Sequence, residues 1–305
     1  MRYRFVVDVG IDPATGRRKQ LTRTFATLKE AKAEYARITN RREEGTLVPP
    51  NQITVNEWLD QWLAMKAVDL EETTIYNYRV TLDRVRGKLG HIRLQELAEE
   101  NVEEWMHWAL RCGRVRGGKA GTPLGVTSVE MSLARLKDAL NRAVTRRLVT
   151  VNVAQHVTIP RRARKEERKK KQEVKPWNVQ EVQAFIHGVR TERLYAALLL
   201  SLMGLRPAEV CGLRWEDVDL EAATITIANT RTMMGNRYVV EKDTKSLAGE
   251  RDLPLPAPVL AALKSFKALQ AKEKLVLGEA YSDSGYVVVH ETGEGFTIKQ
   301  LRRRA

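Results

Sequence analysis

Apolar and polar side chains alternate along the first part of the chain, and the period then changes from that of a strand to that of a helix. The apolar side chains at every second position are Tyr3, Phe5, Val7 and Val9. A Gly/Asp/Pro-rich turn is expected at 10–16, followed by a second strand at 17–25. Thr27 and Glu30 have capping-box spacing at the start of a helix that runs to about residue 44. Residues 1–50 are therefore predicted to form a small α+β module.

Residues 51–158 carry apolar stripes at helical spacing. A second capping-box pair, Thr54 and Glu57, opens the first of these helices. The further helices are expected at about 74–85, 99–110 and 126–147. Such stripes more often form a protein core than a ligand site, so we expect an all-α bundle.

The pattern changes again from residue 176 onward. Asn178 and Glu181 have cap spacing at a helix start, and a strongly apolar helix is expected over 193–203. Three short strands at about 221–228, 238–241 and 251–255 and a helix at about 258–275 complete the pattern. This order predicts a third, α+β domain over 176–305. The fold class expected for the whole chain is multidomain α+β.

Charge adds a candidate partner to this picture. The chain holds 52 Lys or Arg against 38 Asp or Glu, a formal net charge of +14, which favours a polyanion and nucleic acid above all. Residues 160–175 hold nine basic and three acidic side chains with almost no apolar ones, so 159–175 is predicted to be a basic linker that builds no core. Residues 1–50 hold 11 basic and 6 acidic side chains. Two domains joined by a basic arm could grip one nucleic acid.

Two groups of cations are candidate contacts to such a polyanion. On the second predicted strand they are Arg17, Arg18, Lys19 and Arg23. On the solvent face of the helix at 126–147 they are Arg135, Lys137, Arg142 and Arg146. A basic sheet face can enter a DNA groove and a basic helix can follow phosphates, but edge strands and surface helices also carry such charges without any partner.

Several other classes of function are not indicated. The longest strongly apolar run, 195–205, is far shorter than the roughly 20 residues that cross a bilayer, so we expect no membrane attachment and a cytoplasmic protein. Cys112 and Cys211 stand alone, and we expect no disulfide, metal site or cofactor. The loop at 113–120 has most of the residue spacing of a nucleotide-binding phosphate loop, but it lacks the Ser or Thr that would hold magnesium.

The most informative stretch is GLRPAEVCGLRWEDVDL, residues 204–220. Arg206 lies at the junction of two predicted elements, and Glu209, one turn later, can fix its guanidinium while the outer donors face a phosphate. An isolated Arg-x-x-Glu pair is common on surface helices, where it is only a structural ion pair. The whole run, however, resembles the motif of the tyrosine recombinase (phage integrase) family that carries the first catalytic arginine.

Other parts of the chain resemble the same family. DTKSLAGERDLPLP, residues 243–256, looks like the family's β-hairpin with the catalytic lysine, which places Lys245 at the hairpin tip. Residues 1–50 resemble the arm-type DNA-binding module of phage-lambda-like integrases, and residues 54–158 resemble their helical core-binding domain.

The resemblance implies a mechanism and partners. A tyrosine attacks the scissile phosphate, forms a 3′-phosphotyrosyl link and releases a 5′-hydroxyl without metal or ATP. Arg206 would stabilise the charged phosphorane and Lys245 would act as general acid. The partner would be double-stranded attachment-site DNA with arm and core sites, bound by four protomers. A DNA-bending accessory protein is a further candidate partner.

The sequence departs from the family after the hairpin motif. The family requires a His-x-x-Arg motif and a Tyr nucleophile there, but His290 is followed by Glu-Thr-Gly. Tyr281 and Tyr286 precede the expected position and are interpreted as core residues. We therefore expect 176–305 to be the N-terminal part of an incomplete catalytic domain, and the chain to bind DNA without cutting it. A non-catalytic DNA-binding regulator derived from an integrase is the alternative, and a basic protein that coats nucleic acid without specificity is a second one.

Overall fold

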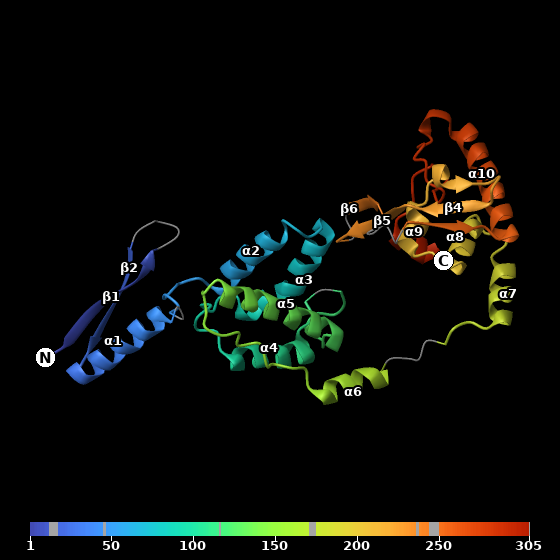
Figure 1. Ribbon diagram of the computed structural model, residues 1–305. Coiled ribbons are helices and arrows are strands. Elements are labelled where there is room, and N and C mark those ends of the chain that lie inside the picture. The colour runs from blue at the N-terminus through green and yellow to red at the C-terminus, as the bar shows by residue number, and fades with distance from the viewer. Residues whose placement is uncertain are drawn as a thin grey trace. The chain divides into compact units, whose positions relative to one another are not determined.

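The computed structural model describes seven stretches of the chain (Figure 1). These are residues 1–11, 18–44, 47–115, 117–170, 175–235, 238–243 and 250–304. The chain divides into two compact units, Met1–Glu173 and Val174–Ala305. None of the described helices is both long enough and apolar enough to cross a lipid bilayer.

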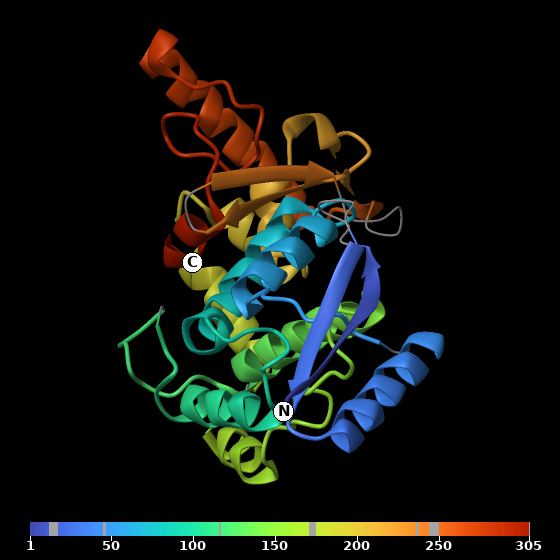
Figure 2. The ribbon, with the colours of Figure 1, turned by 90° about the vertical axis from the view of Figure 1, so that its left-hand side faces the viewer.

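The N-terminal module consists of two strands and one helix, as the alternating pattern predicts. Strands β1 (Tyr3–Ile11) and β2 (Arg18–Phe25) pair antiparallel, with a register shift near Asp8. Helix α1 (Leu28–Glu43) begins after Thr27, which forms the predicted capping box with Glu30. Figure 2 shows α1 beside the two-stranded sheet.

Aromatic and aliphatic side chains form the small core of this module. The Phe5 ring stacks on that of Phe25 with centroids 5.8 Å apart and meets Tyr35 edge-on at 5.5 Å. The buried aliphatic side chains are Val7, Ala31 and Ile38. Because so few side chains are buried, most of the module's surface remains open to a partner.

Four helices form the bundle that follows. They are α2 (Val55–Lys66), α3 (Glu72–Leu89), α4 (Glu99–Cys112) and α5 (Val126–Thr145). Their apolar stripes face one another, and two tryptophans at the centre keep their indole N–H groups hydrogen-bonded. Trp58 Nε1 donates to the Ala139 carbonyl at 2.9 Å, and Trp105 Nε1 donates to the Arg84 carbonyl at 3.0 Å. Burial of polar tips is tolerated because each finds an acceptor.

Part of the predicted basic linker is a helix, α6 (Arg161–Lys170), rather than an extended segment. Arg, Lys, Glu and Ala are good helix formers, so a run without apolar residues can still be helical when it is anchored. The anchor is α5: the Glu167 carboxylate accepts a hydrogen bond from the backbone N–H of Val126, and Arg164 Nε pairs with Glu130 at 2.9 Å. Helix α5 begins after Gly125, which has no capping side chain, so Glu167 supplies the missing cap.

The second unit combines helices with two small sheets. Its helices are α7 (Val179–Gly188), α8 (Tyr195–Leu202), α9 (Pro207–Gly212), α10 (Ala257–Leu277) and α11 (Ile298–Arg304), with short 3-10 turns at Trp215–Asp217 and Gly278–Ala280. One sheet has the order β3 (Val218–Asp219), β4 (Thr224–Ile227), β7 (Arg251–Pro254), and the other pairs β5 (Asn229–Met234) with β6 (Tyr238–Asp243). Helix α8 is buried almost all round, as its continuous apolar run predicts.

The strands differ from the sequence prediction in number and in pairing. The pattern predicts three strands in this region, whereas the structure adds the two-residue strand β3 and strand β5, whose side chains are only half-buried and therefore give a weak alternating signal. Strand β7 pairs with β4, and β6 pairs with β5. The described strands on either side of Lys245 thus belong to different sheets, and the interpretation of 243–256 as one hairpin is wrong for these strands.

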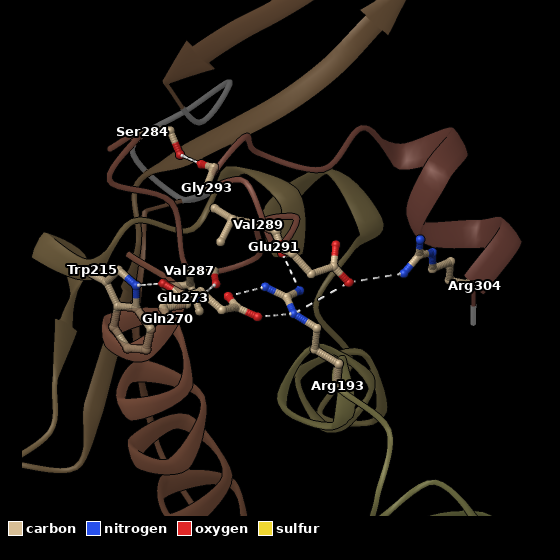
Figure 3. A network of polar contacts seen from close by, with 10 residues as sticks. All are labelled: Arg193, Trp215, Gln270, Glu273, Ser284, Val287, Val289, Glu291, Gly293 and Arg304. Atoms are coloured by element: carbon tan, nitrogen blue, oxygen red, sulfur yellow. Dashed lines mark hydrogen bonds and ion pairs between the residues drawn. The ribbon is translucent and has the colours of Figure 1, made fainter. Parts of the chain in front are cut away.

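Residues 285–296 form an irregular segment that polar contacts hold against α8 and α10 (Figure 3). Arg193, just before α8, donates from Nη1 to the Val289 carbonyl at 2.6 Å. Gln270 of α10, which is 8% exposed, donates from Nε2 to the Val287 carbonyl at 2.7 Å. These bonds satisfy carbonyls that no regular sheet or helix would otherwise pair.

Candidate nucleic-acid interface

Arg206 lies in a tight turn between α8 and α9. Gly204 has φ 89°, a left-handed conformation that glycine adopts without strain, and Pro207 fills the first position of α9, where its missing N–H costs nothing. The sequence Gly-Leu-Arg-Pro therefore fixes where one helix ends and the next begins. It leaves the Arg206 side chain 77% exposed at the junction.

Glu209 holds Arg206 in place from one turn further along α9. Its side chain is 2% exposed, and it accepts hydrogen bonds from the backbone N–H and from Nη1 of Arg206, both at 2.8 Å. Arg251 of β7 donates to the same carboxylate from Nη2 at 3.1 Å and from Nη1 at 3.3 Å. Burial by itself raises the pKa of Glu209, but the hydrogen bonds from Arg251 and Arg206 outweigh it and leave that pKa below its ordinary value. The carboxylate is therefore charged at neutral pH.

This arrangement can bind a phosphate. The Arg206 guanidinium is anchored on the inner side and open on the outer side, so its remaining donors can hold phosphoryl oxygens without first being ordered. The interpretation of Arg206 and Glu209 as a functional pair predicted this contact, whereas Arg251 was missed. Arg251 lies 42 residues from Glu209, and only its position inside the lysine motif at 243–256 could have suggested it.

Strand β5 lies directly against the end of α9. A Cβ atom on Gly212, the last residue of α9, would lie 2.8 Å from the backbone nitrogen of Arg231 and 2.9 Å from the Cα of Thr230. Only glycine allows this approach, because a methyl group would overlap backbone atoms that cannot turn aside. The β5–β6 pair therefore supports α9 at the end opposite to Arg206.

The Tyr286 ring is enclosed by charged side chains. The guanidinium of Arg231 lies 4.9 Å from its ring centroid and that of Arg214 lies at 5.1 Å, and Glu241 of β6 pairs with both arginines. Burial, and then Glu241, raise the pKa of Tyr286. Tyr286 is 7% exposed, so this tyrosine has the surroundings of a core residue.

Lys245 lies outside the described residues, but both ends of its segment can be followed. The segment leaves β6, which pairs with β5, and β5 contacts Gly212. It returns in β7 at Arg251, which pairs with Glu209. The β7 end thus contacts α9, the helix that begins immediately after Arg206, and the β6 end is joined to α9 through β5.

The candidate cations of the first unit differ in their surroundings. Arg18 and Arg23 are exposed on β2, and Arg18 pairs only loosely with Asp8 at 3.9 Å. Arg17 and the side chain of Lys19 lie outside the described part of the chain. On α5, Arg142 and Arg146 are exposed.

The other two α5 candidates are engaged within the bundle. Arg135 lies 4.1 Å from the ring centroid of Tyr78, and Lys137 Nζ donates to the Gln155 carbonyl at 3.0 Å. A phosphate contact by either side chain would compete with these interactions. Among the residues that the structure describes, no group of His, Cys, Asp or Glu could hold a metal ion.

Two family models match the first unit. Residues 1–41 match an arm DNA-binding domain, and residues 54–108 match the N-terminal SAM-like domain of phage integrases. The matches fall within the α+β module and the first helices of the bundle. They agree with the resemblance to integrases found in the sequence.

Two integrases among the curated relatives match nearly the whole chain, and a third relative matches part of it. An integrase of Streptomyces ambofaciens is 24% identical over 306 residues, covering 99% of this chain and 74% of the relative. The ICEBs1 integrase of Bacillus subtilis is 20% identical over 94% of this chain and 74% of its own length. A tyrosine recombinase XerC-like protein of Caldanaerobacter subterraneus subsp. tengcongensis is 28% identical over 44% of this chain and 38% of its own length.

Solved structures show the same fold. The Tn1549 transposon integrase in complex with transposon right end DNA has a TM-score of 0.63 at 17% identity, covering 82% of this chain and 77% of that one. A lambda integrase tetramer bound to a Holliday junction has a TM-score of 0.53 at 18% identity, covering 96% of this chain and 78% of that one.

The fold is thus that of the DNA-bound integrases. The two domain matches and the integrase relatives agree with this fold. The resemblance to the tyrosine recombinase (integrase) family that the motif around Arg206 suggested is therefore supported by all three kinds of match.

Proposed function

We propose that the chain binds the attachment-site DNA of a mobile element as part of a site-specific recombinase. The observation that carries this proposal is the Arg206 guanidinium, which is exposed, anchored by a buried carboxylate and situated in the motif shared with the integrases. The net charge of +14 supports a nucleic acid as the partner. The proposal includes a division of the chain into four parts: an arm module at 1–50, a core-binding domain at 51–158, a linker at 159–175 and a catalytic domain from 176.

The chemical roles follow from the charges at the scissile phosphate. Arg206 would bind two phosphoryl oxygens and stabilise the negative charge that develops in the phosphorane. Lys245 would protonate the leaving 5′-oxygen, and the support for this role is that the strand after its segment, β7, contacts the Arg206 helix through Arg251. The nucleophile would be a tyrosine, and the 305 residues contain no His-x-x-Arg motif after residue 245. We therefore propose that this chain binds DNA and does not cut it.

The partner DNA would be held at two kinds of site. The module at 1–50 would contact arm-type sites through the exposed face of β2, and the bundle and second unit would contact the core site. The lambda integrase neighbour is a tetramer on a Holliday junction, which supports four protomers acting together on paired sites. A DNA-bending accessory protein would bring arm and core sites together.

A footprinting experiment with two variants tests the proposal. Wild-type chain should protect arm and core sequences on the element's attachment DNA. Deletion of 1–50 should abolish arm protection and leave core protection measurable, whereas Arg206→Ala should weaken the core site and spare the arm sites. Equal losses at both sites for both variants would contradict the division of labour, and protection without sequence preference would indicate a nucleic-acid-coating protein instead.

Cleavage is tested separately with a nicked suicide substrate that traps covalent protein–DNA adducts. No adduct is expected from this chain. An adduct would contradict the non-cleaving proposal, and its loss in Tyr281→Phe or Tyr286→Phe would identify the nucleophile. The alternative function, a regulator that competes for integrase sites without catalysis, is favoured by the enclosed position of Tyr286. It predicts inhibition of recombination when the chain is added to an active integrase on the same DNA.

A further inference from the structure

The carboxylate that anchors Arg206 is shared with a second arginine. Arg251, the first residue of β7, meets Glu209 end-on, with Nη2 3.1 Å from Oε2 and Nη1 3.3 Å from Oε1. Arg206 uses one side-chain nitrogen, Nη1, which lies 2.8 Å from Oε1. Arg251 thus approaches both oxygens, and Arg206 approaches one of them with its side chain.

The three side chains are buried to very different degrees. Glu209 is 2% exposed, Arg251 is 33% exposed and Arg206 is 77% exposed. The inner arginine and the carboxylate therefore form a screened pair, and the outer arginine is the member that reaches solvent. Two positive charges and one negative charge leave the cluster with a net charge of +1.

The balance would change if Arg251 were neutral. A buried carboxylate requires a counter-charge, and Arg206 would then be the remaining cation of the cluster. The pair of Glu209 and Arg206 would carry no net charge, and the guanidinium would be drawn inward onto both carboxylate oxygens. A DNA phosphate would then meet a neutral ion pair.

We propose that Arg251 is a positioning residue that neutralises Glu209 and so leaves the charge of Arg206 available to a DNA phosphate. The inference rests on the proposed function, since it assumes that Arg206 binds phosphate. Strand β7, which follows Lys245 in the chain, would thus carry the residue that neutralises the anchor of Arg206. The proposal competes with two other roles for Arg251. One is a direct contact to the DNA phosphate, and the other is a purely structural ion pair with Glu209.

The test is the salt dependence of binding of the full chain to a short mixed-sequence B-DNA duplex. Each phosphate contact contributes about 0.9 to the slope of log Kobs against log salt concentration. Arg206→Gln and Arg251→Gln should each reduce the slope by about one, and the double variant should also lose only about one. Arg251→Lys, which keeps the charge, should retain the wild-type slope. Arg190→Gln, an exposed arginine on the same unit, controls for the general loss of one positive charge.

A charge-rescue variant separates the three roles. In Glu209→Gln/Arg251→Gln the carboxylate charge is gone and Arg206 keeps its charge, so the slope should exceed that of Arg251→Gln by about one. A direct phosphate contact by Arg251 predicts no rescue and a loss of about two in Arg206→Gln/Arg251→Gln. A purely structural role predicts a lower melting temperature for Arg251→Gln with an unchanged slope. Either result would overturn the inference.

The experiment also distinguishes failure of the inference from failure of the proposed function. An unchanged slope in Arg206→Gln would remove the phosphate contact itself, whereas a reduced slope in Arg206→Gln with an unchanged one in Arg251→Gln would overturn only the role of Arg251. If Arg251→Gln does not fold, Glu209→Gln is compared with Glu209→Gln/Arg251→Gln. Equal slopes support the inference, and a loss of about one in the double variant contradicts it.

Discussion

Arg193 should be one of the most costly polar side chains to remove from the second unit. Its guanidinium meets Glu273 in two parallel bonds of 2.8 and 2.7 Å and reaches the Val289 carbonyl at 2.6 Å (Figure 3). The two side chains are 17% and 15% exposed, and the ring centroid of Phe266 lies 5.2 Å from the guanidinium. Arg193→Met keeps the packing and removes all three donors.

The magnitude follows from burial. Removing one partner of a buried ion pair costs about 3–5 kcal/mol, whereas an exposed pair contributes about 0–1 kcal/mol. Because both side chains retain some contact with water, we expect Arg193→Met to cost about 3 kcal/mol. Glu273→Leu should cost about the same, and the double variant should cost less than either single variant rather than about 6 kcal/mol, since it leaves neither member of the pair unpaired.

Hydrogen exchange measured by mass spectrometry on peptides from 285–296 reports the local free energy of opening. The amides of Val287 and Phe296 donate to Leu213 and Val288 carbonyls at 2.9 and 3.1 Å and should lose protection together. The matched control is Asp283→Asn, which breaks an ion pair of 2.6 Å to a lysine whose side chain is 54% exposed. Additive costs in the double variant, or a control as costly as Arg193→Met, would refute the argument from burial.

Three further predictions concern other parts of the chain. Glu167→Ala should lower the free energy of unfolding by about 1 kcal/mol through loss of the α5 cap, and Glu167→Gln should lower it by less. Thermal unfolding of the first unit measures both variants, and no difference from wild type would contradict the capping role. Gly212→Ala should cost about 1–3 kcal/mol because its methyl meets the β5 backbone, whereas Gly188→Ala, with nothing within 4 Å, should be neutral or slightly stabilising; urea titrations of both variants compare them. The pKa of Glu209 is lowered in the folded chain, so its contribution is present at pH values above its unfolded pKa and is lost as the pH falls through the folded pKa; Glu209→Gln should flatten the acid limb of stability against pH, and parallel limbs would contradict it.

The sequence predicted those features that depend on neighbouring residues. Capping boxes at Thr27, Thr54 and Asn178 mark helix starts in the structure, because each is a contact between residues three positions apart. The motif around Arg206 likewise predicted its anchor in Glu209, since both lie within one turn of α9. The resemblance to integrases followed from the same local run of residues.

What the sequence by itself determined, then, is most of the helices, the resemblance to integrases and the pair of residues that begins α9. Only the tertiary structure decided that β6 and β7 belong to different sheets, that the basic run after the bundle is a helix docked on α5, and that Arg251 shares the carboxylate of Glu209. The two side-chain contacts join residues that are 41 and 42 positions apart in the chain. The strand pairing depends on which strand lies beside which in the folded domain. A single charged side chain carries no periodic signal of its partner, so such pairings are fixed by how the elements pack and by the need to leave no buried charge unpaired.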